Sequence, residues 1–92
     1  MLESVKKYLR ITWKSEDDDI ERMIERGKSQ IERLTGTSID FEEDLVAQDL
    51  LFDYCRYSYN NALEYFEDNF KSQILALQIH EAIRVGDSND ST

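Results

Sequence analysis

One apolar stripe at helical spacing constrains the fold of this chain more than any other feature. Between residues 20 and 34, apolar or small side chains recur at intervals of three and four, as they do along one face of an α-helix; these are Ile20, Met23, Ile24, Gly27, Ile31 and Leu34. Ser15 is placed to cap the start of this helix and Gly36 to end it. Because glycine inside a helix costs about 1 kcal/mol relative to alanine, we expect a second helix to approach closely at Gly27.

Three further segments have helical spacing. A short helix is expected up to Arg10, a third helix after Asp40 as its N-cap, and a fourth from about Leu63 or Glu67 to Val85. The chain contains no proline and shows little period-2 alternation, which favours helices over strands. We therefore predict an all-α fold, a small antiparallel helical bundle with two long central helices, a short N-terminal helix and a C-terminal helix. Residues 1–85 would form a single helical domain, and residues 86–92 a flexible polar tail.

Charge is spread unevenly along the chain. The net charge is −9, yet residues 1–14 carry four basic side chains against one acidic, whereas residues 37–69 carry nine acidic side chains against Arg56. A chain this acidic is not expected to bind nucleic acid through its general field, because phosphate contacts need clustered lysine and arginine. The hydrophobic fraction of 40% argues against disorder, and no apolar run is long enough for a membrane span.

No residue pattern typical of catalysis or of metal binding occurs in the sequence. The acidic runs 16–19 and 42–44 fit helix starts, where the helix dipole favours negative charge. His80 and Glu81 would begin a zinc-protease motif, but the second histidine is replaced by Arg84. Cys55 stands among apolar residues, which indicates an inert buried thiol, and a single cysteine fits a reducing, intracellular origin. We expect no enzyme activity, no cofactor, no metal site and no small-molecule substrate.

Protein contacts are the function that the charge split and the aromatic residues favour. The candidate residues on one side of such a contact are Lys6, Lys7, Arg10 and Trp13. Those on the other side are Asp40, Glu42, Glu43, Asp44, Asp49, Asp53, Tyr54 and Tyr57, and Arg84 begins a tail that could order on a partner. Core packing of the tyrosines and a merely solvated basic segment remain open alternatives. Charge reversal at Lys6, Lys7 and Arg10 is expected to prevent assembly without unfolding the subunit.

The first part of the chain also carries a family resemblance. The order is Val5-Lys6-Lys7-Tyr8-Leu9-Arg10-Ile11, then aspartates before Ile20, then a helix that ends at Thr35-Gly36. This resembles the N-terminal signature of the phage head–tail connector (adaptor) proteins, also labelled DNA-packaging proteins. From Asp40 to Val85 only the general plan agrees: a helix, a tyrosine-rich junction and a closing helix.

The resemblance implies a virion structural protein of a phage or prophage. Such a subunit would assemble with itself as a ring below the portal protein, extend the DNA channel and dock a tail-side stopper or completion protein. DNA would pass through without specific binding, and no membrane would be involved. The protein would lie at the head–tail junction of the virion, and in the host cytoplasm before assembly.

Two other classes stay open on the residues alone. The acidity of residues 37–69 suits an acidic helical regulator or DNA-mimic protein encoded by a prophage, which would bind a DNA-binding protein and be displaced by DNA. An enzyme or metal carrier would have to use Glu42, Glu43, Asp44 and His80, and its melting temperature would shift with metal.

Overall fold

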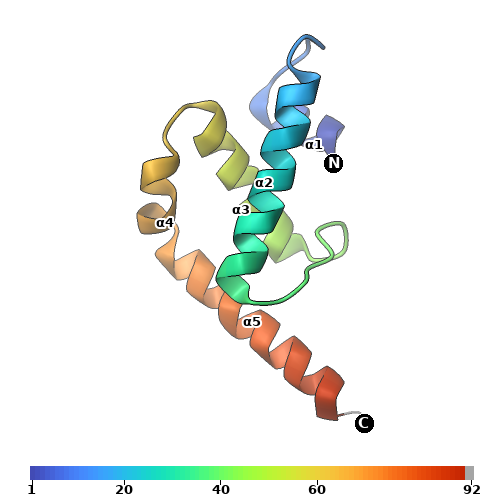
Figure 1. Cartoon of the computed structure of the whole chain (residues 1–92), viewed down its shortest axis with the longest axis vertical. Coiled ribbons are helices and arrows are strands. Elements are labelled where there is room, and N and C mark those ends of the chain that lie inside the picture. Colours follow the sequence, from blue (N-terminus) through green and yellow to red (C-terminus); the bar gives the residue numbers. More distant parts are fainter. Residues whose placement is uncertain (91–92) are drawn as a thin grey trace.

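The fold is all-α, as predicted. The computed structural model describes the backbone of residues 1–90 and the side chains of residues 1–86, and no strand occurs in residues 1–90. The elements in chain order are α1 (Leu2–Leu9), α2 (Asp17–Thr35), α3 (Leu45–Tyr59), the 3₁₀ turn η1 (Leu63–Tyr65), α4 (Phe66–Asn69) and α5 (Lys71–Asp90). Figure 1 shows α2 through the centre of the molecule, with α3 crossing it and α5 running away from it towards the C-terminal end.

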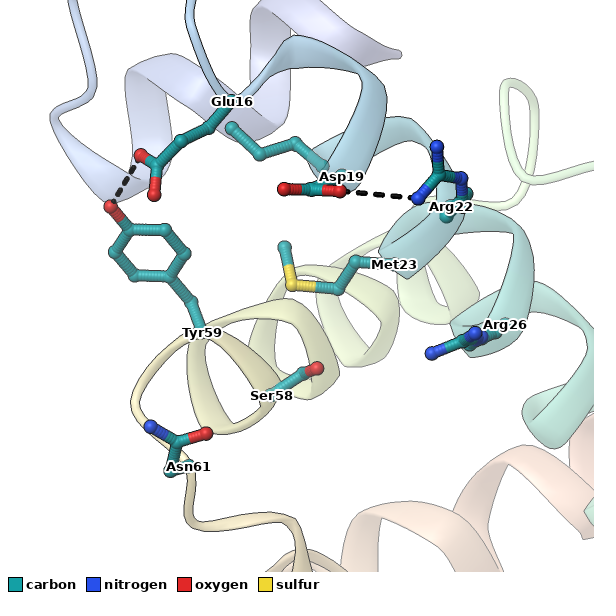
Figure 2. A pocket seen from close by; sticks show the side chains of 9 residues that line it. Glu16, Asp19, Arg22, Met23, Arg26, Ser58, Tyr59 and Asn61 are labelled. Atoms are coloured by element: carbon teal, nitrogen blue, oxygen red, sulfur yellow. Dashed lines mark hydrogen bonds and ion pairs between the residues drawn. The ribbon is translucent and has the colours of Figure 1, made fainter.

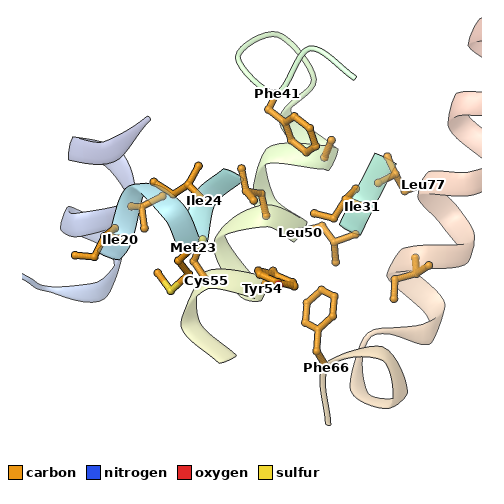
Figure 3. Packing of buried hydrophobic residues seen from close by; sticks show 14 of the residues in the cluster. Ile20, Met23, Ile24, Ile31, Phe41, Leu50, Tyr54, Cys55, Phe66 and Leu77 are labelled. Atoms are coloured by element: carbon orange, nitrogen blue, oxygen red, sulfur yellow. The ribbon is translucent and has the colours of Figure 1, made fainter. Parts of the chain in front are cut away.

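A single hydrophobic core lies between α2, α3 and α5. The stripe of α2 supplies Ile20, Ile24 and Ile31, which are at most 3% exposed. α3 contributes Leu51 and Cys55, both fully buried. Figure 3 shows Ile20, Ile24, Ile31 and Cys55 between the helices, and Leu77 of α5 and Phe66 belong to the same cluster. The helical spacing of the apolar residues therefore identified the buried face of α2 correctly.

Gly27 marks a close contact between α2 and α3, which confirms the expectation from its place in the stripe. A Cβ atom built at this position would lie 2.7 Å from Leu51 Cδ1 and 2.7 Å from Tyr54 Cδ1. Real Cβ atoms do not approach other carbons this closely, so any larger residue at position 27 would force Leu51 and Tyr54 to shift.

The predicted N-caps of the two central helices are wrong, although the helices are present. Glu16, not Ser15, precedes α2, and its side chain makes no capping bond. Asp44, not Asp40, caps α3, because its carboxylate accepts a hydrogen bond from the Ala47 backbone N–H at 3.1 Å. Asp40 instead accepts from the Glu42 N–H at 3.0 Å and so forms a turn in the connection before α3.

The helix ends follow the sequence more closely. Gly36 ends α2 with a φ of 73°, in the left-handed region that glycine favours, and its N–H donates to Glu32 O. α3 ends at Tyr59, and Asn61 reverses the chain with a φ of 56°. Asparagine tolerates this conformation better than most residues, which suits Asn61 to the turn after α3.

The predicted fourth helix is divided in the structure. η1, α4 and α5 replace it, and the break falls at Phe70, whose φ and ψ are −115° and 22°. Phe66 causes the compact turn, because its ring is 2% exposed and packs edge-on against Tyr54 and Tyr57 and stacked on Phe70. The backbone of α5 continues to Asp90, past the expected end at Val85. A flexible tail was expected at residues 86–92. The structure describes the backbone of this segment only to Asp90 and its side chains only to Gly86, so its flexibility stays a prediction.

Candidate assembly surfaces

The end of α1 holds an arginine in a conformation that favours glycine. Arg10 follows the helix with a φ of 62°. The Ile11 N–H donates to Lys6 O at 2.8 Å and the Arg10 N–H to Lys7 O at 3.2 Å, the bond pair of a Schellman motif. In this motif a residue with a Cβ costs about 1–2 kcal/mol relative to the right-handed region. The backbone therefore presents an exposed guanidinium at a position where the fold alone would favour glycine.

Trp13 is exposed but held in place. Its ring is 47% exposed, and its Nε1–H donates to Glu16 Oε2 at 2.6 Å. The same oxygen accepts from the Tyr59 hydroxyl at 3.0 Å, and this bond raises the pKa of Tyr59 above its ordinary value because ionisation would oppose the carboxylate. Figure 2 shows Tyr59 and Glu16 pointing towards each other at the rim of a pocket of about 620 Å³ between α2 and the end of α3. An ordered exposed tryptophan is typical of a protein contact site.

Together these residues form what we call the N-terminal surface. Its members are exposed and combine basic with aromatic side chains; they are Lys7, Tyr8, Arg10, Trp13 and Lys14. Tyr8 is 43% exposed, and its hydroxyl donates to Asp53 Oδ1 at 2.9 Å. Burial and Asp53 both raise the pKa of Tyr8, so its hydroxyl stays protonated at neutral pH.

Lys6 does not belong to this surface. The residue is 5% exposed, and its Nζ lies 2.6 Å from Asp17 Oδ1 in the first turn of α2. The ion pair ties α1 to α2 inside the subunit. Lys6 therefore stabilises the folded subunit. The expectation that its charge can be reversed without unfolding the subunit is wrong, because the reversal would break this ion pair.

The acidic candidates divide into exposed and structural groups. Asp40, Glu42, Glu43 and Asp49 are exposed. Asp44 is committed to the cap of α3, and Asp53 accepts hydrogen bonds from Tyr8 and Arg56. Three of these four exposed candidate acids therefore lie in the connection between α2 and α3.

The tyrosine candidates lie in the interior junction rather than on an open face. Tyr54 is 8% exposed, and burial raises the pKa of its hydroxyl. Tyr57 is half-buried between Phe66 and Phe70, and its hydroxyl accepts from Asn69 Nδ2 at 2.9 Å. For both residues the structure shows the core alternative, in which the ring packs inside the subunit.

Arg84 links α5 to the connection between α2 and α3. Its Nε donates to Glu81 Oε2, and its second guanidinium nitrogen donates to Ser38 O at 3.0 Å. Gln78 Nε2 also donates a hydrogen bond to Leu34 O at 2.9 Å.

The side chain of Glu81 is buried, which the sequence alone did not predict. A signal existed, because residue 81 continues the spacing of the buried residues Ile74 and Leu77.

A second face of α5 is apolar and uncovered. Leu75, Ile79 and Ile83 recur every four residues and are 56%, 53% and 60% exposed. This stripe lies on a face different from that of Ile74 and Leu77, which are packed in the core. Exposed stripes of this kind are found at contact sites of assembling proteins.

Potential metal-ligating side chains are spread over the described part of the chain. Within it, no group of three or more histidine, cysteine, aspartate or glutamate side chains is placed to hold a metal ion. His80 Nε2 lies 3.7 Å from Asp44 Oδ2, whereas Glu42 lines a separate hollow. None of the described helices is both long and apolar enough to cross a membrane.

Cys55 is expected to be unreactive in the folded protein. Burial raises the pKa of its thiol to about 12, so very little thiolate exists at pH 8. We expect a disulfide reagent to label it about a thousandfold more slowly than a free cysteine of pKa about 8.5. The rate is measured by absorbance at pH 8, with the urea-unfolded chain as control. Equal rates in both states would show that the thiol is accessible.

Comparison with known proteins gives one match. The family model described as "Phage gp6-like head-tail connector protein" matches residues 1–92, the whole chain. Neither the curated proteins nor the solved structures contain a match.

Proposed function

The chain belongs to the phage gp6-like head-tail connector family, and from this we propose that it assembles with itself as a ring at the head–tail junction of a virion. Membership supports a structural role in a phage particle. In the proposed ring the subunits sit below the portal protein, extend the DNA channel and receive a tail-side stopper or completion protein. The subunit would do this as a binding protein, without catalysing a reaction.

Two unlike surfaces support a head-to-tail arrangement. The N-terminal surface is basic and aromatic, and the connection between α2 and α3 exposes Asp40, Glu42 and Glu43. A contact between two different patches repeats from one subunit to the next and closes into a ring when the rotation allows it. Opposite charges would favour the correct register between neighbours. The net charge of −9 also fits a channel wall along which DNA slides, since it offers few phosphate contacts.

The observation that carries the proposal is the conformation of Arg10. A left-handed arginine weakens the fold, and such strain concentrates at functional positions. Arg10 is exposed, and Trp13, three residues on in the chain, is exposed and ordered; arginine and tryptophan are typical of binding hot spots. The N-terminal surface therefore has the chemistry of a contact site, at a cost to the stability of the free subunit.

Arg10→Gly should accordingly change stability and assembly in opposite directions. Glycine relieves the left-handed strain, so we expect the free energy of unfolding to rise by about 0.5–1 kcal/mol. Removal of the guanidinium should reduce ring formation on the portal. Urea unfolding checks the first effect, and co-sedimentation with the portal protein, followed by negative-stain microscopy, checks the second.

The matched control is Arg22→Gln, which removes an exposed arginine from α2 without changing a special backbone conformation. It should leave rings intact. Normal ring density from Arg10→Gly would remove Arg10 from the contact. If the wild-type chain and the portal are both folded and do not bind, the connector role fails, and the acidity of residues 37–69 would favour an acidic regulator, to be tested by pull-down of DNA-binding proteins.

A further inference from the structure

A second cavity lies between the start of α3 and the outer half of α5. Its volume is about 520 Å³, and its wall includes Glu43, Asp44, Leu45, Val46, Glu81 and Arg84. With Asp40, the wall holds four carboxylates, against the guanidinium of Arg84 and the imidazole of His80, so the cavity carries negative charge. Leu45 and Val46 add an apolar side, since they are 66% and 53% exposed at the first turn of α3.

Glu81 in this wall has an unsatisfied oxygen. The residue is 0% exposed, and Arg84 satisfies only its Oε2. Within the described residues, Glu81 Oε1 accepts no hydrogen bond, and it is the one buried side-chain nitrogen or oxygen there without a partner. A buried acceptor left without a donor costs about 1–3 kcal/mol. The buried carboxylate, whose other oxygen pairs with Arg84, is therefore short of one donor.

The chemistry of the cavity restricts what can fill it. The carboxylates would bind a cationic hydrogen-bond donor, and the exposed aliphatic side chains would pack against an apolar or aromatic surface around that donor. DNA is unsuitable because the carboxylates repel phosphates. The N-terminal surface of a second copy offers both parts, since Arg10 and Trp13 are both exposed and lie three residues apart in the chain.

We propose that this cavity receives the N-terminal surface of a neighbouring copy of the chain, and that Arg10 of that copy completes the hydrogen bonding of Glu81. The inference rests on the proposed ring and names the two surfaces that meet in it. The connector between α1 and α2 lies at one end of the long axis of the molecule, and the outer half of α5 lies at the other (Figure 1). The two surfaces are therefore carried by separate regions of one subunit.

A charge exchange across the contact provides the sharpest test. Glu43 is exposed, and Glu43→Lys should weaken self-association by about tenfold or more, as should Arg10→Glu. A single chain that carries both substitutions places a lysine opposite a glutamate at every contact. It should recover part of the lost self-association, because the new lysine attracts the new glutamate while Glu81 still repels it. Sedimentation velocity over a range of concentrations, with and without the portal protein, measures the change.

Glu64→Lys is the matched control, because it makes the same charge change at an exposed position in η1, away from the cavity. It should leave self-association unchanged. Glu81→Gln tests the buried group separately. Because it removes a buried charge but keeps the shape, we expect the midpoint of unfolding to stay within a few degrees of wild type while self-association weakens about tenfold.

The outcomes separate this inference from the connector role. Rings that form normally with Glu43→Lys and Glu81→Gln would overturn the inference and leave the connector role standing. Loss with Glu43→Lys and no recovery in the doubly substituted chain would show that the cavity binds something other than Arg10, which also overturns the pairing. A wild-type chain that associates neither with itself nor on the portal would overturn both.

Discussion

Lys6→Glu is expected to lower the free energy of unfolding by about 3–5 kcal/mol. The side chain of Lys6 is 6% exposed, and its Nζ lies 2.6 Å from Asp17 Oδ1, whose side chain is 29% exposed. Glutamate would place a second carboxylate against Asp17 with little water to screen the repulsion. The broken ion pair and the new buried carboxylate together account for this cost, and a domain of 92 residues has only a small margin of stability. The variant should be largely unfolded at 37 °C.

Lys7→Glu is the control for this prediction. It makes the same charge change one residue later, but Lys7 is exposed. Its unfolding free energy should remain within about 0.5 kcal/mol of wild type, while ring formation is reduced. Circular dichroism during urea unfolding distinguishes the two variants. Equal stability of Lys6→Glu and Lys7→Glu would contradict the buried ion pair, and it would return Lys6 to the set of interface residues.

Gly27→Leu is expected to have a comparable effect through packing alone. Even a Cβ atom at this position meets Leu51 and Tyr54 at 2.7 Å, and leucine adds three further carbons in the same direction. Both neighbours are buried and cannot move into solvent. Overpacking of this kind costs about 3 kcal/mol or more, well above the gain of about 1 kcal/mol that replacing a helical glycine brings.

Gly86→Ala provides the matched comparison, since Gly86 also lies in a helix but has no atom within 4 Å of a Cβ built there. That variant should be neutral or more stable by up to about 1 kcal/mol. Urea unfolding of the two variants beside wild type measures the difference. If Gly27→Leu unfolded at the wild-type urea concentration, α2 and α3 would have to be farther apart than the structure places them.

Local patterns predicted the elements of the fold well and their exact starts less well. The stripe of α2 and the stop at Gly36 depend on residues close in sequence, so spacing was sufficient. The caps were misplaced because several acids stand near each helix start, and any of them could accept the first backbone N–H groups. Asp40 is used for a turn and Asp44 for the cap, a choice that depends on the path of the chain between α2 and α3. The division at Phe70 likewise depends on rings from α3.

The candidate surfaces were predictable only in part. The basic and acidic segments are visible in the sequence; Lys7, Arg10 and Trp13 are exposed, and their place in a contact stays a prediction. Burial of Lys6 was not predictable, because it requires Asp17 to fold back beside α1. The strain at Arg10 is also hidden, since nothing in the residue type indicates a left-handed backbone.

The contact at Gly27 has a consequence for the geometry of the assembly. In the proposed ring, the rotation that relates one subunit to the next is a full circle divided by the number of subunits. The receiving cavity lies at the start of α3, and the inserted surface is fastened to α2 through the ion pair of Lys6 and Asp17. In that ring the crossing of α2 and α3 would contribute to the rotation, and the packing of Leu51 and Tyr54 against Gly27 is part of that crossing. A small tilt of these two helices, repeated around the ring, would change how many subunits close the circle or open it into a spiral.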